Sequence, residues 1–163
     1  MALYVWLLTI VHTILSFVAI GLGIKATLGL FRSAHSNWWT RRFFEAAAAV
    51  TFTGFIFPFT GVTPAFATGI VSTAILIAWF IAFRAHVAGA WRRVYALAMV
   101  ASLYLLIFVT IAQAFLKVPS LHELAPTGSE PPFAIAQIAG LVIFIVIGFL
   151  AVRRFRPVGA VSA

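Results

Sequence analysis

Cysteine is missing from this chain of 163 residues, and acidic residues are nearly missing, with three Asp and Glu against eleven Lys and Arg. The lack of cysteine excludes disulfides, thiolate metal sites, iron–sulfur clusters and thiol catalysis. Charged residues of either sign make up only 9% of the sequence, whereas about a quarter of the residues of a soluble domain are charged. The chain therefore has too few charges to form the surface of a soluble domain.

Apolar residues take the place of the missing charges. They make up 64% of the chain, and the mean hydropathy is +1.13. The first apolar run covers residues 3–31 and would form a helix roughly 44 Å long at about 1.5 Å per residue. A hydrocarbon core of about 30 Å requires a shorter helix than that. The run therefore predicts a helix that crosses a membrane.

Four further apolar runs follow, separated by connections that contain basic residues, tryptophan or proline. The sequence therefore predicts an all-α integral membrane bundle of five transmembrane helices, with residues 1–163 as a single transmembrane domain. We expect the second helix to continue through a kink at Pro58, because its residues before that proline cover only about 22 Å. We expect Ser129 to cap the fifth span. The predicted spans cover residues 3–31, 43–61, 66–83, 94–116 and 133–152.

Basic residues gather on one side of the predicted bundle. Of the eleven Lys and Arg, only Lys117 falls on the opposite side, and cytoplasmic connections are the ones enriched in basic residues. The sequence predicts an outside N-terminus, a cytoplasmic C-terminus and a place in the inner (cytoplasmic) membrane of a bacterium. Short basic clusters at span ends do not form the polar face that nucleic acid requires. We therefore expect the lipid bilayer as the surroundings and no nucleic-acid partner.

His12 lies inside the first span, on the helical face that also carries Thr9, Thr13 and Ser16. An ionisable residue at membrane depth costs on the order of 2.5 kcal/mol, which makes it a candidate for function. His12 could ligate haem, relay protons or bind a quinone-like head group. Alternatively, it is a neutral imidazole that forms a hydrogen bond to a neighbouring helix.

A haem held by two histidines requires a second histidine at matching depth. We expect His35 and His86 at the cytoplasmic end and His122 in the outer connection, so His12 has no evident partner. The spacing His-x-x-x-His does not occur, and the adjacent His122 and Glu123 point apart, which leaves no metal site. The sequence therefore assigns no cofactor and leaves haem as the open alternative.

Lys25 and Glu45 form a second pair of candidates near the cytoplasmic end. The first two spans are antiparallel, so the two side chains lie at similar depth. They could form a salt bridge that locks the hairpin, or Lys25 could extend to the interface beside a glutamate near a helix N-terminus. The functional alternative is a proton-coupled carboxylate at Glu45.

The outer end of the fourth span carries the third group of candidates. Thr110, Gln113 and Lys117 share a helical face there, and Gln137 of the fifth span lies at similar depth. These residues could line an outward-facing polar vestibule between the first, fourth and fifth spans, or they could simply form hydrogen bonds between helices. The candidate vestibule comprises His12, Thr110, Gln113, Lys117, Gln137, Glu123 and Glu130.

No motif of soluble enzymes occurs in the chain. A glycine-rich phosphate loop, a nucleophile elbow and a catalytic pair of carboxylates are all absent, so we assign no catalytic residue. Residues 113–119, 129–137 and 153–157 read QAFLKVP, SEPPFAIAQ and RRFRP. These segments resemble small, uncharacterised multi-spanning inner-membrane proteins of bacteria. The resemblance implies a localisation and no particular activity.

Three functions stay open. The first is a non-catalytic binding or accessory subunit of a membrane complex, within a homo-oligomer or a larger assembly, which predicts co-purification with a partner. The second is permeation of a small solute or ion, which requires a continuous polar path from His12 and Gln113 to Lys25 and Glu45 and is excluded by a dry apolar belt between them. The third is haem- or quinone-linked redox chemistry, which predicts a pigment that His12→Ala removes.

Overall fold

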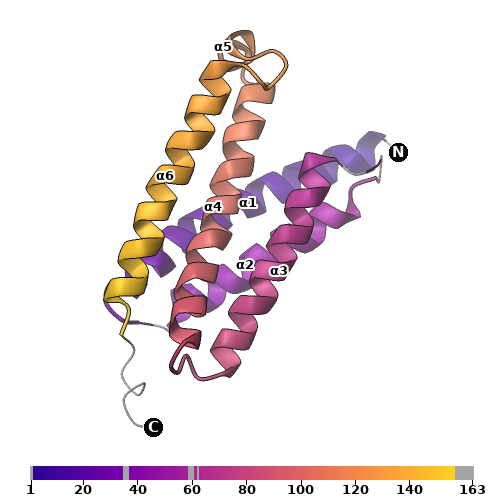
Figure 1. Ribbon diagram of the computed structural model, residues 1–163. Coiled ribbons are helices and arrows are strands. Elements are labelled where there is room, and N and C mark those ends of the chain that lie inside the picture. The colour runs from indigo at the N-terminus through magenta and orange to yellow at the C-terminus, as the bar shows by residue number, and fades with distance from the viewer. Residues whose placement is uncertain (1, 35–36, 59–60, 62, 157–163) are drawn as a thin grey trace.

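The structure is a computed structural model, and it describes residues 2–34, 37–58, 61 and 63–156. Within these residues the chain forms six helices and no strand (Figure 1). The all-α fold that the sequence predicts is therefore confirmed. The helices are α1 (Ala2–Leu30), α2 (Trp38–Ile56), α3 (Pro64–Arg84), α4 (Trp91–Lys117), α5 (Pro119–Leu124) and α6 (Pro131–Arg154).

Four of these helices, α1, α3, α4 and α6, are long and apolar enough to cross a membrane. This confirms that the chain is a helical membrane protein with several candidate spans. Helix α2 has 19 residues, but it carries Arg41, Arg42 and Glu45 within its first turns. Its composition alone therefore does not qualify it as a span.

Helix α2 begins and ends earlier than the sequence predicts. The Oδ1 atom of Asn37 accepts a hydrogen bond of 2.9 Å from the backbone N–H of Thr40, so the helix starts at Trp38. From there it covers about 28 Å up to Ile56 without any kink. The predicted continuation through Pro58 is wrong, because Phe57, the residue before the proline, has extended backbone (φ −59°, ψ 146°).

Helix α6 also starts differently. Its N-cap is Glu130, with extended backbone, and Pro131 occupies the donor-free first turn. The prediction that Ser129 caps this helix is wrong. The Ser129 N–H instead donates to the carboxylate of Glu130 at 3.0 Å, within the short turn that precedes the helix.

Helix α4 is the centre of the bundle. It contacts α1, α3, α5 and α6. In its apolar stretch 39% of the residues are buried, against 11% to 17% in the other three candidate spans. In Figure 1, α4 runs between α6 and α3, and α1 crosses behind it. Helix α2 packs against α1 and α3. The first four helices therefore each pack against the next one in the sequence, whereas α6 packs mainly against α4.

The buried core lies in only one half of the bundle. Every buried residue of α4 falls between Tyr95 and Leu103, and the buried residues of α1 fall in its second part, from Ala19 to Leu30. The rings of Phe43, Trp79, Tyr95 and Phe155 continue this core as an aromatic chain, with centroid separations of 5.4, 6.1 and 5.6 Å. We call this the packed half; it carries the basic helix ends.

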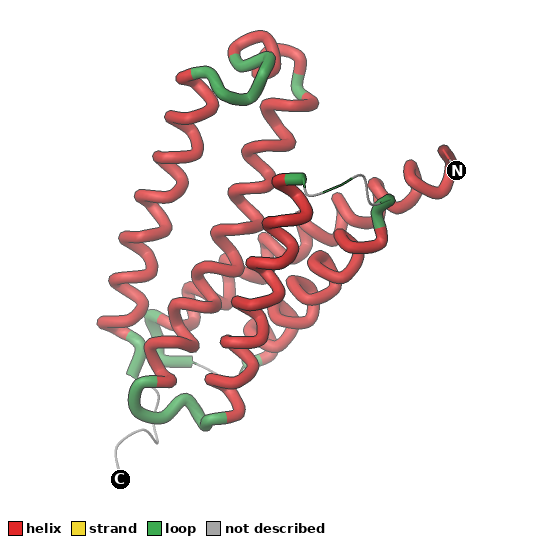
Figure 2. Tube along the Cα trace, turned by 45° about the vertical axis from the view of Figure 1, so that its right-hand side comes forward, coloured by secondary structure: helices red, strands yellow, loops and turns green. Residues whose placement is uncertain are grey.

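The other half of the bundle is open. None of the described side chains is buried in residues 3–18 of α1, 51–56 of α2, 64–75 of α3, 104–117 of α4 or 131–147 of α6. Figures 1 and 2 show that the pair α4 and α6 leans away from the group α1, α2 and α3 toward this end. We call it the open half. It contains the N-terminal part of α1, the C-terminal end of α2, the N-terminal end of α3, and α5.

Candidate functional site

The imidazole of His12 lies between α1 and α2 in the open half. Its Nδ1 is 2.8 Å from Oγ1 of Thr53, and its ring meets the ring of Phe57 edge-on at a centroid separation of 5.5 Å. A Cβ atom added to Gly54 would lie 3.6 Å from Cε1 of His12. The histidine therefore packs on a glycine of the facing helix, where the backbone leaves room for its ring.

The hydrogen bonds of Thr53 bear on which nitrogen of His12 carries the proton. The Thr53 hydroxyl has a single hydrogen, and it donates that hydrogen to the carbonyl of Ala49 at 2.9 Å. With the hydroxyl donating there, Nδ1–H of the imidazole is the donor of the bond to Thr53. In the neutral ring this leaves Nε2 with a free lone pair, and no described residue bonds to it. His12 thus keeps one acceptor, or one metal-ligating nitrogen, unused.

The hydroxyls near His12 do not add to a polar site. Thr9 donates to the carbonyl of Val5 at 2.8 Å, and Ser16 donates to the carbonyl of His12 at 2.7 Å. Both hydroxyls are therefore satisfied within α1 itself. The imidazole is the group on this face of the helix that reaches across to a neighbouring helix.

The candidates on α4 lie on an exposed face of that helix. Thr110 donates to the carbonyl of Leu106 at 2.7 Å. Gln113 and Lys117 are exposed and have no hydrogen-bond or ion-pair partner among the residues that the structure describes. An unpaired amide and an ammonium therefore face the open half.

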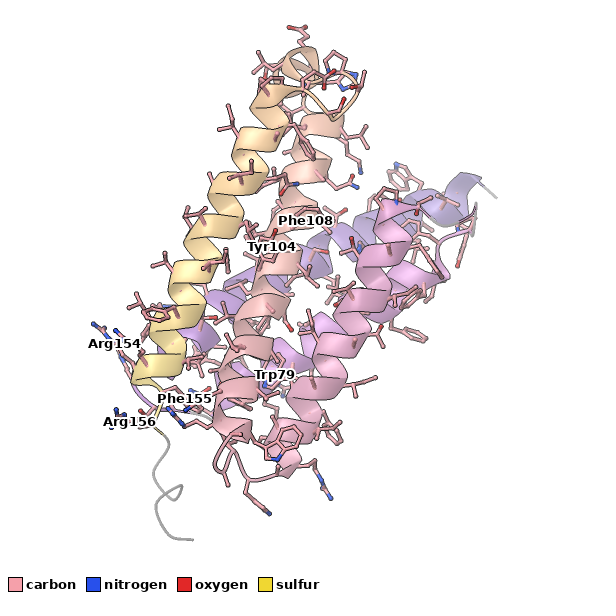
Figure 3. All side chains as sticks on the ribbon, viewed as in Figure 1. Trp79, Tyr104, Phe108, Arg154, Phe155 and Arg156 are labelled. Atoms are coloured by element: carbon pink, nitrogen blue, oxygen red, sulfur yellow. The ribbon has the colours of Figure 1, made fainter. Side chains whose placement is uncertain are left out.

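Gln137 lies in a different seam, between α6 and α4. Its Nε2 donates to the carbonyl of Phe108 at 3.1 Å, at the position of α4 that Figure 3 labels. Its Oε1 is buried and has no hydrogen-bond partner. The amide therefore joins the two helices through its nitrogen alone.

The predicted vestibule is spread over three places. His12 lies in the α1–α2 seam, Gln137 in the α4–α6 seam, and Thr110, Gln113 and Lys117 on α4; no hydrogen bond or ion pair joins any two of these five within the described chain. Of the two glutamates predicted to join them, Glu123 is exposed on α5 and Glu130 folds into its own turn. The predicted vestibule residues therefore do not form a compact site.

At the packed end, Glu45 pairs within its own helix. Its carboxylate accepts from Nε of Arg41 at 3.0 Å and from Nη1 of Arg42 at 2.7 Å. Partners three and four residues away in a helix lie within direct reach. Lys25 is exposed and makes no ion pair with Glu45 in the described part of the chain. The matching depths of Lys25 and Glu45 do not by themselves bring the two side chains together.

The remaining histidines lie away from His12. His86 is exposed in the α3–α4 turn and has a φ of 56°, His122 is exposed on α5, and His35 lies outside the described residues. No group of three or more His, Cys, Asp or Glu side chains in the described ranges could hold a metal ion. The second histidine that bis-histidine haem requires is thus not found at His86 or His122.

Sequence reasoning missed the polar contacts that join the helices. Besides Thr53, the hydroxyls of Thr51 and Ser72 meet at 2.8 Å across α2 and α3. At the packed end, Nη1 of Arg92 donates to the carbonyls of Val152 and Phe155 at the C-terminus of α6. The last carbonyls of a helix need such donors, so an arginine near the start of the preceding long helix was a signal for this contact.

Comparison of the chain with protein-family models, with curated proteins and with solved structures found no match. The resemblance to small inner-membrane proteins of bacteria therefore stays a prediction. The function proposed below therefore rests on the geometry of the described residues.

Proposed function

We propose that this chain is a five-span protein of a bacterial inner membrane and serves as a non-catalytic binding subunit of a larger membrane complex. In this proposal the transmembrane helices of a partner fill the open half. The observation that carries it is the one-sided core: all the buried helix residues in the described ranges lie in the packed half. The N-terminus is outside and the C-terminus is in the cytoplasm.

The length of α2 supports its role as the fifth span. Its 19 residues cover about 28 Å, close to a hydrocarbon core of about 30 Å. The charged residues Arg41, Arg42 and Glu45 lie at its start, beside the basic ends of the other helices, where an interface places them in water and headgroups. With α2 as a span, the basic connections all fall on one side, as the positive-inside rule requires.

Unpaired polar groups in the open half support a protein partner. Lipid tails are as apolar as leucine, so helices associate in membranes through close packing and hydrogen bonds rather than by hiding apolar surface. The amide of Gln113 and Nε2 of His12 have no hydrogen-bond partner among the described residues. A polar side chain on a partner helix would satisfy such groups, whereas lipid tails cannot.

Permeation through a single chain finds no such support. Ala19, Ala46 and Val50 form a buried apolar cluster, with Leu15 and Leu106 packed against it. This cluster lies along the bundle between His12, in the open half, and Glu45, at the packed end. A dry belt of this kind interrupts the polar path that permeation requires.

Extraction of the protein from native membranes into polymer-bounded lipid discs tests the proposal. We expect a discrete complex in which a second polypeptide is present at a fixed ratio to this chain, measured by native mass spectrometry. A photo-crosslinking amino acid at Gln113 should label that polypeptide, because the side chain faces the open half. The same group at Leu97, exposed in the packed half of the same helix, should not.

Two outcomes would contradict the proposal. One is a homogeneous monomer or homo-oligomer that retains no second polypeptide after extraction under the mildest conditions. The other is equal labelling from positions 113 and 97, since a partner in the open half contacts only the first.

A further inference from the structure

An apolar groove lies on the outer surface between α2 and α3. It has a volume of about 440 Å³, within the range of roughly 300–1,000 Å³ typical of small-molecule sites. Phe44 and Phe80 line its packed-half end, and Phe55 lines the other. The hydroxyls of its two threonines, Thr51 and Thr73, bond to the helix carbonyls of Ala47 and Gly69. The groove therefore presents carbon along its whole length.

The length of the groove matches one leaflet of a bilayer. From Phe44 to Phe55 the axis of α2 rises about 16 Å. Half of a hydrocarbon core is about 15 Å. Phe44 lies about one helical turn after Arg41, so the groove begins near the basic end of α2 and extends from there over a length comparable to that of one acyl chain.

Two arginines stand at the interfacial end of the groove. Arg41 lies about two helical turns before Ala48 and three before Phe52, so it is on the groove face of α2. Arg84 lies about one turn after Phe80, on the groove face of α3. The side chain of Arg41 is 82% exposed, and Arg84 is exposed with no ion pair in the described ranges. Glu45 shares its charge between Arg41 and Arg42, so the end of the groove stays positive.

We propose that this groove binds an anionic glycerophospholipid of the leaflet on the basic side. The phosphate of the headgroup lies between Arg41 and Arg84, and one acyl chain lies along the groove against Phe44, Phe52 and Phe55. Basic residues at the ends of transmembrane helices recognise anionic headgroups in this way. At this site two arginines lie in line with the apolar groove. This arrangement distinguishes it from the other basic helix ends.

A partner helix fits this groove less well than an acyl chain does. Helices approach one another closely in membranes where small residues line the contact. The groove is instead lined by phenylalanines, and its threonine hydroxyls are already used. A helix has a diameter of about 10 Å with its side chains, whereas an acyl chain is a single file of methylene groups that fits between aromatic rings.

Lipid titration of the purified full-length protein, followed by native mass spectrometry, tests the proposal. We expect one phosphatidylglycerol to bind at least tenfold more tightly than phosphatidylcholine, since each basic residue near the surface favours an anionic lipid. The double variant Arg41→Gln/Arg84→Gln should lose this preference, by roughly 10- to 30-fold in affinity. Ala48→Leu should weaken the binding of both lipids, because it fills the groove without a change of charge.

Arg42→Gln is the matched control. It removes the other ion pair of Glu45, but Arg42 lies about three turns before Thr53, on the face toward α1. The control should therefore keep the preference for phosphatidylglycerol. Equal binding of the two lipids would overturn the proposal. An equal loss in Arg42→Gln and in the double variant Arg41→Gln/Arg84→Gln would do so as well, as would displacement of the lipid by inorganic phosphate at millimolar concentration.

Discussion

At the scale of single residues, the bond between His12 and Thr53 is the contact with the clearest energetic consequence. Thr53→Val removes the hydroxyl that forms a hydrogen bond of 2.8 Å with Nδ1 of His12. Hydrogen bonds between membrane helices contribute about 0.6 kcal/mol on average and about 1.7 kcal/mol at most. We expect Thr53→Val and His12→Ala to destabilise the protein non-additively, with a coupling of that size in a double-mutant cycle measured by unfolding in mixed micelles.

Thr110→Val is the control for this cycle. The Thr110 hydroxyl donates to the carbonyl of Leu106 in its own helix, so its loss breaks no contact between helices. It should show no coupling to His12→Ala. A zero coupling energy between His12 and Thr53 would mean that the two side chains do not meet in the membrane.

The sequence could predict that His12 matters but not what it binds. Its depth in an apolar run marks it as a candidate, whereas its partner depends on the register between α1 and α2, which no local pattern encodes. Glu45 shows the opposite case. Its partners Arg41 and Arg42 lie within reach along the same helix, and local spacing decides this contact more directly than matching depth does.

At the scale of helices, Gly23 sets the distance at which α1 crosses α4 and α2. A Cβ atom at this position would lie 2.8 Å from Cδ1 of Leu103 and 2.8 Å from Cε2 of Phe43. Since an added methyl group must push both side chains aside, we expect Gly23→Ala to cost about 1–3 kcal/mol. Thermal unfolding in detergent measures the loss.

Gly21→Ala provides the matched control on the same helix. Nothing lies within 4 Å of a Cβ atom at Gly21, so the change only replaces a flexible residue by a good helix former. It should stabilise α1 by roughly 0.5–1 kcal/mol. If both variants lost stability equally, the close crossing at Gly23 would be refuted.

The turn before α6 predicts a dependence on pH. Hydrogen bonds from the backbone N–H of Thr127, from its hydroxyl and from the Ser129 N–H lower the pKa of the Glu130 carboxyl from 4.5 to about 2. Because the folded-state pKa lies below the unfolded one, the ionised carboxylate stabilises the turn fully above about pH 4.5, and the effect is lost as the pH falls to about 2.

We therefore expect Glu130→Gln to be less stable than the parent protein at pH 7 and equally stable near pH 2. Glu123→Gln is the control, since Glu123 is exposed on α5 in the same connection and should show no such convergence. Thermal unfolding at several pH values measures both differences. A Glu130→Gln difference that stays constant across this range would contradict the lowered pKa.

The helices themselves were predictable to different degrees. Helices α1, α3, α4 and α6 follow long apolar runs, and their bounds in the structure lie within a few residues of the predicted ones. Helix α2 was misplaced because its first turn, which includes Trp38, Trp39 and Arg41, resembles a polar interfacial loop. The cap at Asn37 extends the helix into that segment, and this removes any need to pass Pro58.

At the scale of the whole molecule, the one-sided core could not be read from the sequence. In a soluble helix the apolar stripe marks the buried face, but a membrane helix is apolar all round. Both halves of α4 are largely apolar, and the contacts of their side chains with other helices are what separate buried from unburied positions. The asymmetry of basic residues was readable, because it lies in short connections, and it coincides with the packed half.

The orientation of the whole bundle gives the last prediction, and the absence of cysteine makes it directly testable. Single cysteines at Ala34, Ala88 and Ser129 place a thiol in each of three connections, and one at Ala65 places a thiol in the first turn of α3, next to the fourth. With five spans and an outside N-terminus, a membrane-impermeant maleimide should label positions 65 and 129 in intact spheroplasts, and positions 34 and 88 only after the membrane is permeabilised. If α2 does not cross, positions 34 and 65 must share one side. Equal labelling of those two positions before permeabilisation would therefore exclude the five-span topology, since α2 is the one helix that the structure describes between them.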